Sequence, residues 1–217
     1  MSLEALARAV SADFLEVFGH CAALPSDGVG DGTIVLFGPR EPGFWGHFTE
    51  SAEWQDGAPD PMDRWSERVI SYAASKVGGQ ALFPFGDPVR PFFSWATRTG
   101  RAFSSPVAIL VHDVAGLMVS YRGAVLLPEV IAPDAPRNPC DSCEAKPCLT
   151  ACPVGALTGS GYDLPKCHAY LDTSEGKDCM ANGCGVRLAC PVSQNYGRVS
   201  DQSAYHMGRF HRTDANS

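Results

Sequence analysis

Residues 140–191 read CDSCEAKPCLTACPVGALTGSGYDLPKCHAYLDTSEGKDCMANGCGVRLACP, and this stretch decides how the chain is interpreted. It holds eight of the nine cysteines. They are Cys140, Cys143, Cys148, Cys152, Cys167, Cys179, Cys184 and Cys190. A proline directly follows two of them, at Pro153 and Pro191. Clustered thiols of this kind indicate a site that binds metal through thiolate sulfur.

The spacing predicts two [4Fe-4S] clusters that exchange one ligand between two cysteine runs. It resembles the spacing of bacterial two-cluster ferredoxins, in which the cysteine before the proline binds the other cluster. That cysteine lies about one helical turn beyond the preceding one, so it points past the first cluster. The proline then turns the chain away. We expect one cluster on Cys140, Cys143, Cys148 and Cys190, and the second on Cys152, Cys167, Cys179 and Cys184.

Zinc and disulfides are the alternatives to iron–sulfur clusters. Structural zinc sites also use four cysteines, but their ligands usually come as separated C-x2-C pairs, and the sequence has one such pair, Cys140–Cys143. Disulfides need an oxidising compartment. The N-terminus, MSLEALARAVSADFLEVFGH, lacks the layout of a signal peptide. Eight thiols also close two sites of four with none left over, which favours the clusters.

Composition places limits on partners and location. The net charge of −7 disfavours binding to nucleic acid or to a membrane surface, and it suits a basic patch on a redox partner protein that donates electrons. A hydrophobic content of 45 % is ordinary for a chain that buries a core. No apolar run reaches the roughly 20 residues of a membrane helix, so we expect a cytoplasmic protein without a membrane segment.

The pattern along the chain predicts an α+β fold. We expect helices over 2–18 and 61–77, strands over 33–37 and 81–83, and a hairpin of 107–112 with 117–122. Residues 38–60 are rich in Gly, Pro and aromatics, and are either a functional loop or a loop pinned to the core by its rings. The expected domains are 1–135, 136–200 and a tail over 201–217, with a proline-rich linker at 128–139.

Three passages carry a family resemblance: SPVAILVHDVAGLMVSYRGAVLLPE at 105–129, the cysteine runs with CPVGAL, and the lone cysteine in DLPKCHAYL at 163–171. Together they resemble the epoxyqueuosine reductase family. The resemblance implies a nitroreductase-like, cobalamin-binding N-terminal domain followed by a small ferredoxin-like domain with two clusters. It also implies that Cys167 is a cluster ligand. The passage ALFPFGDPVRPFFSWA at 81–96 looks like the cobalamin-processing chaperone family, which shares the first domain.

A flat cofactor such as a corrinoid needs an apolar floor and a few polar anchors. Phe83 and Phe85, within an aromatic segment at 81–95, are candidates for the floor, and Tyr121 and Arg122 for the anchors. The alternative is that these rings belong to the core.

Three further side chains are weighed separately. His168, beside Cys167, is either a hydrogen-bond donor to a cluster sulfur or a solvent-exposed histidine. His112 is a candidate corrin contact or a structural residue. Cys21 is expected to be a buried apolar side chain.

Three functions follow from these observations. The first is an iron–sulfur oxidoreductase that passes electrons to a corrinoid, or to another cofactor or substrate, at the N-terminal domain. The second is a ferredoxin-type electron carrier or subunit whose first domain is a docking module. The third is a zinc-bound interaction protein. No catalytic residue is assigned, and enzymatic activity is left open.

Overall fold

The computed structural model describes residues 2–211, which form two compact units. Unit 1 comprises the described residues up to Ala102 together with Ser120–Arg137. Unit 2 comprises Phe103–Val119 and the described residues from Asn138 onward. Runs of helices and antiparallel strands both occur along the described chain, which confirms the expected α+β class.

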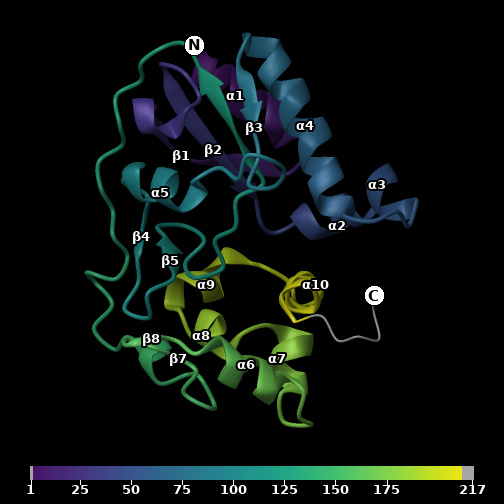
Figure 1. Cartoon of the computed structure of the whole chain (residues 1–217), viewed down its shortest axis with the longest axis vertical. Coiled ribbons are helices and arrows are strands. Elements are labelled where there is room, and N and C mark those ends of the chain that lie inside the picture. The colour runs from purple at the N-terminus through teal and green to yellow at the C-terminus, as the bar shows by residue number, and fades with distance from the viewer. Residues whose placement is uncertain (1, 212–217) are drawn as a thin grey trace. The chain divides into compact units, whose positions relative to one another are not determined.

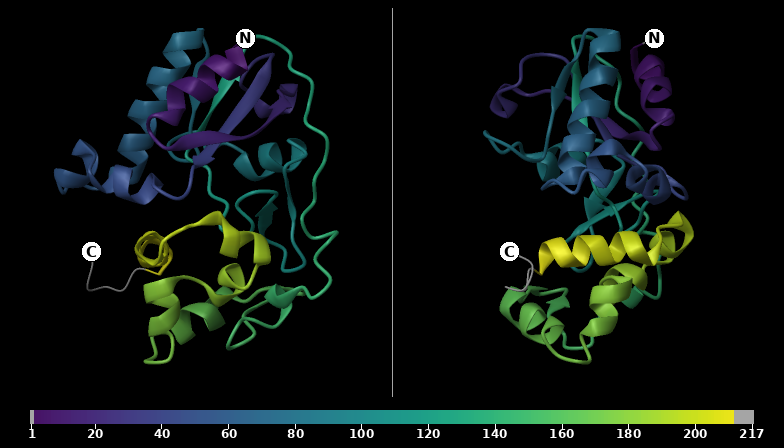
Figure 2. Two further views of the ribbon diagram at one scale, coloured as in Figure 1. Left: turned by 180° about the vertical axis from the view of Figure 1, so that it is seen from behind. Right: turned by 90° about the vertical axis from the view of Figure 1, so that its right-hand side faces the viewer.

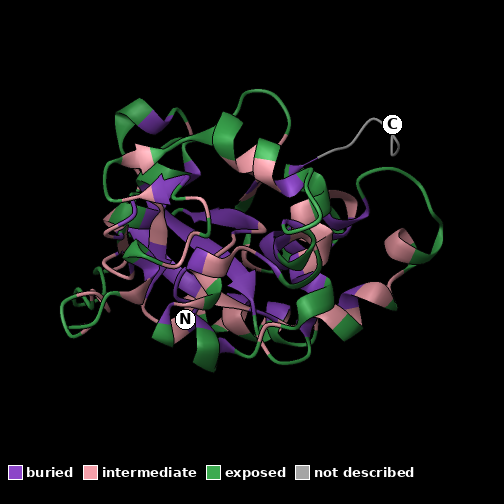
Figure 3. Cartoon of the chain, turned by 90° about the horizontal axis from the view of Figure 1, so that it is seen from below, coloured by how far each residue is buried: buried purple, intermediate pink, exposed green. Residues whose placement is uncertain are grey.

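Unit 1 is built on a four-stranded sheet in the order β1-β2-β6-β3, in which each neighbouring pair is antiparallel (Figure 1). The strands are β1 (Leu15–Ala22), β2 (Thr33–Pro39), β6 (Gly123–Leu127) and β3 (Gln80–Leu82). The central strands read TIVLFGP and GAVLL, and all their residues are buried, as the purple ribbons of Figure 3 show. Continuous apolar strands of this kind need cover on both faces.

Five helices belong to unit 1, and two of them cover the sheet. They are α1 (Ser2–Ser11), α2 (Phe44–Thr49), α3 (Ala52–Gln55), α4 (Pro61–Val77) and α5 (Phe92–Arg98), and a short 3-10 turn spans Pro25–Asp27. Helices α1 and α4 pack on each other and against the sheet, whereas α5 packs on β1 (Figure 2). Helix α4 buries Met62, Trp65, Val69 and Ala73, which recur every three or four residues.

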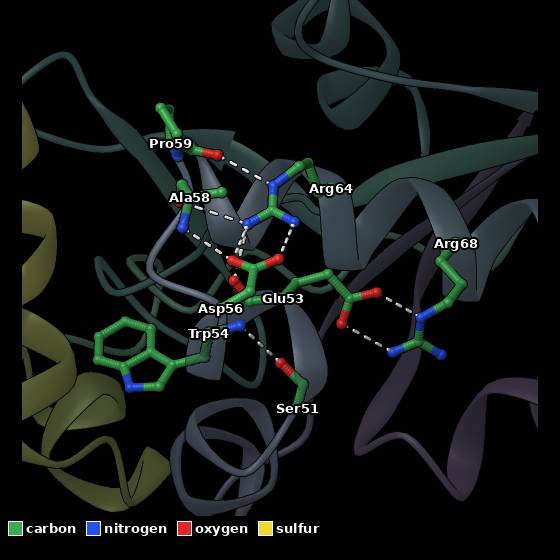
Figure 4. A network of polar contacts seen from close by, with 8 residues as sticks. All are labelled: Ser51, Glu53, Trp54, Asp56, Ala58, Pro59, Arg64 and Arg68. Atoms are coloured by element: carbon green, nitrogen blue, oxygen red, sulfur yellow. Dashed lines mark hydrogen bonds and ion pairs between the residues drawn. The ribbon is translucent and has the colours of Figure 1, made fainter.

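The aromatic segment at 38–60 is pinned to the core. The Phe44 ring meets the Trp65 ring edge-on, with centroids 5.4 Å apart, and Phe48 meets Trp54 at 5.3 Å. Two arginines of α4 hold the segment from the other side, since Arg64 binds Asp56 and Arg68 binds Glu53 (Figure 4). The structure therefore gives these rings a packing role, and the segment forms α2 and α3.

The first helix is shorter than the range 2–18 that the sequence predicts. It ends at Ser11, and Phe14 takes a φ of 52° before the chain enters β1. Val17 then pairs with Phe37 of β2. The apolar residues between 14 and 18 fit a helical period. In the structure most of them belong to a strand, because pairing with β2 satisfies their backbone hydrogen-bonding groups.

The proline-rich segment at 128–137 lies along unit 1. The Thr33 hydroxyl donates to the Glu129 carbonyl and accepts from the Ile131 N–H. His20 Nε2 lies 2.7 Å from the carbonyl oxygen of Ala132. These bonds attach to the sheet a segment that the sequence describes only as a linker.

Unit 2 consists of short elements. Strand β4 (Ala102–Ser104), which begins at the last residue of the first segment of unit 1, pairs with β5 (Leu110–His112). Strand β7 (Leu157–Thr158) pairs with β8 (Gly161–Tyr162). The helices are α6 (Leu164–Leu171), α7 (Lys177–Asn182), α8 (Gly185–Leu188), α9 (Pro191–Tyr196) and α10 (Ser200–Phe210), and a 3-10 turn spans Pro147–Leu149. Its core includes Val107, Leu117 and Val186 together with Cys148 and Cys190.

The expected hairpin of 107–112 with 117–122 is wrong. The turn forms, because His112 and Gly116 exchange two backbone hydrogen bonds, but the ladder stops there. The Leu117 N–H donates to Ser193 Oγ, and its carbonyl accepts from Arg187. Side chains of α8 and α9 thus take the groups that a second strand would have needed, and residues 103–119 join unit 2 instead of the first domain.

The expected tail begins as a helix. Helix α10 packs against α7, so residues 200–210 belong to unit 2, and the rest of the expected tail after His211 lies outside the described residues. Among the helices of residues 2–211, none has the length and apolar character that a membrane crossing requires.

Candidate metal centre

Four cysteines of unit 2 line one pocket. The pocket has a volume of about 310 Å³, and Cys140, Cys143, Cys148 and Cys190, here called the first thiol group, all reach its wall. Apolar side chains complete the lining, among them Val111, Leu117, Pro139, Pro147 and Val192. Three of the thiols come from one loop and the fourth from a residue 42 positions after Cys148, which is the set that the spacing predicts.

Local backbone geometry directs these thiols. The Asn138 side chain accepts from the Cys140 N–H and donates to Asp141, so it holds the start of the loop. Cys148 lies in the 3-10 turn. Cys190 has an extended backbone and precedes Pro191, the first residue of α9. Proline at this position suits a helix start because its missing N–H has no partner to lose there.

Burial and mutual repulsion act together in the first thiol group. Burial raises the pKa of Cys140, and the thiols of Cys148, Cys190 and Cys143 raise it further. Burial likewise raises the pKa of Cys148, with added contributions from Cys190 and Cys143. A raised pKa favours the neutral thiol at Cys140 and Cys148, whereas a bound metal would stabilise the deprotonated form.

The other four cysteines, Cys152, Cys167, Cys179 and Cys184, form the second thiol group. Cys167 lies on α6 and Cys179 on α7, and Cys184 directly precedes α8. Burial raises the pKa of Cys167 and of Cys179, and the Cys184 thiol raises both further. The Cys152 thiol also raises the pKa of Cys167. The thiols of Cys152 and Cys184 therefore both lie near Cys167.

Hydrogen-bond donors surround the second thiol group. The Ala156 N–H lies 3.1 Å from Cys152 Sγ. Burial alone would raise the pKa of Cys152, but the backbone N–H groups from Val154 to Leu157 outweigh it and lower that pKa. The Tyr162 hydroxyl donates to Cys167 Sγ at 3.3 Å. Consecutive N–H groups and a hydroxyl aimed at sulfur form a setting that favours thiolate over thiol.

The first thiol group lines a pocket whose volume suits a cluster of several irons. Within residues 2–211, no three His, Cys, Asp or Glu side chains lie close enough together to hold one metal ion. A zinc ion draws its four sulfurs to about 2.3 Å from a single centre. In a [4Fe-4S] cluster each thiolate binds its own iron, so the sulfurs stand further apart around a larger group. A 310 Å³ pocket lined by four thiols matches that requirement.

The structure gives other contacts to the two candidate histidines, His168 and His112. His168 Nδ1 lies 2.7 Å from His211 Nδ1, and its ring stacks on Phe210. The donor to Cys167 is Tyr162 instead. His112 is fully buried, and its Nδ1 accepts the N–H groups of Val114 and Ala115, so it has a structural role in a turn of unit 2.

The candidate cofactor residues of unit 1 do not form one exposed floor. Phe83 and Phe85 are partly buried and stack on each other with centroids 5.1 Å apart. Tyr121 is buried and packs edge-on against Phe18, and Trp95 is fully buried. The backbone N–H of Arg122 donates to the carbonyl of Phe37. Part of the predicted floor and the Tyr121 anchor are therefore used by the core.

Cys21 is buried, as expected. Its sulfur lies 3.8 Å from Arg98 Nη2, in a corner where Arg98 also binds Asp27. All three residues belong to unit 1.

Sequence reasoning missed Asn138, Tyr162 and Arg187. A signal existed for two of them: Asn138 stands two residues before the first thiol, where an Asx side chain often caps a turn, and Arg187 is the one charged residue between Cys184 and Cys190. Tyr162 gives no such signal, because its approach to Cys167 depends on the β7–β8 turn.

Comparison of the chain with models of known families, with curated proteins and with solved structures found no match. The resemblance to the epoxyqueuosine reductase family thus stays a prediction drawn from the quoted passages.

Proposed function

We propose that this protein is an electron-transfer protein whose unit 2 binds two [4Fe-4S] clusters. The observation that carries the proposal is the pocket that brings Cys140, Cys143 and Cys148 together with the distant Cys190. In the second set, the thiols of Cys184 and Cys152 both raise the pKa of Cys167. Such clusters supply one-electron transfer when bound. In this proposal unit 2 is ferredoxin-like in its ligand exchange, and unit 1 corresponds to the nitroreductase-like domain that the family resemblance implies.

The side chains of unit 2 would perform three tasks for the clusters. The eight thiolates bind them, and backbone N–H groups such as that of Ala156 offset the negative charge on sulfur. The apolar wall of Val111, Leu117 and Val192 excludes water from the first thiol group. Pro153 and Pro191 turn the chain after the exchanged ligands.

Metal content under anaerobic conditions tests the proposal directly. The protein should contain about eight iron and eight sulfide per chain, the sum for two four-iron clusters. Cys148→Ser should remove iron, whereas Cys21→Ser, a buried cysteine of unit 1, should leave it unchanged. Stoichiometric zinc without iron would instead support the zinc-bound interaction protein.

The exchange of ligands has its own test. Cys190→Ser should perturb the same electron paramagnetic resonance signal as Cys143→Ser, and Cys152→Ser the same signal as Cys184→Ser. If Cys152→Ser matched Cys143→Ser, each cysteine run would close its own cluster and the exchange would be refuted.

The identity of the electron acceptor separates an oxidoreductase from a carrier. A corrinoid or another flat cofactor at unit 1 has narrower support, namely the partly exposed stacked pair of Phe83 and Phe85. Titration with cob(II)alamin and with flavin should change the visible spectrum if unit 1 binds either one. Phe85→Ala should weaken that binding, while Phe93→Ala, an exposed ring of α5, serves as the control. No change with either ligand would favour the electron carrier with a docking module.

A further inference from the structure

We infer that the two clusters are unequal, because Tyr162 and Arg187 raise the reduction potential of the cluster on the second thiol group above that on the first. The inference rests on the proposed function. Under it, the first electron from a one-electron donor resides on the second thiol group. Tyr162 and Arg187 act as positioning residues that set the order in which the clusters are reduced.

Tyr162 supplies a directed hydrogen bond. Its hydroxyl donates to Cys167 Sγ at 3.3 Å, and its ring stacks on Phe210 with centroids 6.2 Å apart. The stack and strand β8 fix the ring, so the hydroxyl stays aimed at the sulfur. Donors to cluster sulfurs stabilise the reduced, more negative state.

Arg187 supplies a fixed positive charge. It lies on α8, one helical turn after Cys184, and interacts electrostatically with the Cys184 thiol and with Tyr162. Its Nη1 donates to the carbonyl of Leu117, which anchors the guanidinium within unit 2. The side chain is partly buried, so water screens its charge less than that of a surface arginine. A cation held beside a cluster favours the addition of an electron.

The first thiol group has a different environment. Its pocket wall is mostly apolar, and the two charged side chains in the lining, Glu144 and Lys146, have opposite signs and are exposed. Opposite charges that face solvent offset each other. Asp141 interacts with Cys140 in this group and Asp178 with Cys179 in the other, so nearby aspartates do not separate the two sites. Among side chains, the difference therefore comes from Tyr162 and Arg187, and the backbone N–H groups beside Cys152 act in the same direction.

The redox step is a simple addition. One electron enters the cluster from a one-electron donor, no bond forms or breaks in the protein, and the charge of the site becomes more negative by one. Because the guanidinium and the hydroxyl are already in place, the second thiol group accepts that charge with little rearrangement. The apolar wall of the first thiol group opposes the same change.

A redox titration of the anaerobic protein with dithionite, followed by electron paramagnetic resonance, tests this order. Cys143→Ser and Cys184→Ser assign the two signals to the first and second thiol groups. The signal of the second thiol group should appear at the higher potential. Tyr162→Phe and Arg187→Gln should each shift that signal to lower potential and leave the other in place, whereas Arg187→Lys should keep most of the wild-type value.

Tyr170→Phe is the matched control, because the Tyr170 hydroxyl donates to the Glu175 carbonyl and not to sulfur. It should leave both potentials unchanged. Iron content separates the possible failures. A protein without iron overturns the proposed function and this inference together. A protein with eight irons can still overturn this inference alone. It does so if the two signals have equal potentials, if the first thiol group is reduced first, or if Tyr162→Phe shifts neither potential. If Arg187→Gln does not fold, Tyr162→Phe and Arg187→Lys still decide the question.

Discussion

The two units differ in what holds them together. Unit 1 buries a four-stranded sheet between helices, and its fully buried side chains include Trp65, Phe37 and Ile34. Unit 2 has helices of four to eleven residues and strands of two or three, and two cysteines, Cys148 and Cys190, lie in its core. Short elements bury little apolar surface, so they stabilise a domain weakly. Unit 1 has an apolar core built on its own sheet, whereas under the proposed function the stability of unit 2 would rest more on the clusters that its thiols bind.

The largest expected effect is therefore the loss of metal. Because metal binding contributes folding free energy to a small domain, removing the proposed iron with a chelator should unfold unit 2 and leave unit 1 folded. Hydrogen exchange measured by mass spectrometry should show amides of 140–190 approaching the rate of an unfolded chain, while those of β2 stay protected. If the amides of 140–190 stayed protected from exchange after metal removal, unit 2 would not need metal for its stability and the two units would not differ in this way.

The thiol groups could be predicted from sequence because ligand spacing is a local property. The interval from Cys148 to Cys152 and the proline at 153 predict that Cys152 belongs to the later set, and in the structure the Cys152 thiol raises the pKa of Cys167. The surroundings of the thiols could not be predicted. Tyr162 reaches Cys167 through a turn, and Val111 and Leu117 line the pocket from a segment that the sequence assigned to the other domain.

The fold, too, could be predicted only where the deciding residues lie close together in the sequence. Helix α4 was predictable because Pro61, a strict apolar period and Gly78 at φ 65° all agree. The error at 107–122 arose where a local pattern competes with a distant partner. Gly116 leaves room for Ser193, since a Cβ there would lie 2.5 Å from its nitrogen. The hairpin pattern gives no information about Ser193, which lies 76 residues after Leu117.

A cavity made in the sheet of unit 1 tests how strongly buried apolar side chains stabilise that unit. Leu36 is fully buried on β2, so Leu36→Ala should lower the free energy of unfolding by about 2–5 kcal/mol. Leu24→Ala removes the same atoms from a side chain that is 42 % exposed, and it should have a much smaller effect. Urea denaturation followed by circular dichroism measures both. Similar losses for the two variants would mean that burial in the sheet does not dominate unit 1.

A smaller effect is expected from the ion pair of Asp27 and Arg98. Asp27 is buried and accepts from Arg98 Nη2 at 2.6 Å and from the Leu24 N–H at 2.8 Å. Burial alone would raise the pKa of Asp27, but these hydrogen bonds outweigh it and lower that pKa. Asp27→Asn should cost about 1–3 kcal/mol at neutral pH, as expected for hydrogen bonds to a charged group.

The sign of the pH dependence follows from the lowered pKa. The carboxylate stabilises the folded state fully above its unfolded pKa of about 3.9, and this contribution disappears as the pH falls through the lower folded value. The gap between wild type and Asp27→Asn should be constant above about pH 5 and shrink below about pH 4. Asp31→Asn, an exposed aspartate, is the control. A gap that widened on acidification would contradict the lowered pKa.

The smallest effect should come from the pair that joins α3 to α4. Arg68 binds Glu53 through Nε at 2.5 Å and Nη2 at 3.1 Å, but the Arg68 side chain is 54 % exposed (Figure 4). Because water and salt screen such a pair, Glu53→Gln should cost under about 1 kcal/mol, and less in high salt. Glu67→Gln on the exposed face of α4 is the matched control. Urea denaturation at low and high salt measures both variants. A loss as large as that of Leu36→Ala would mean that surface charge, rather than the buried sheet, holds unit 1 together.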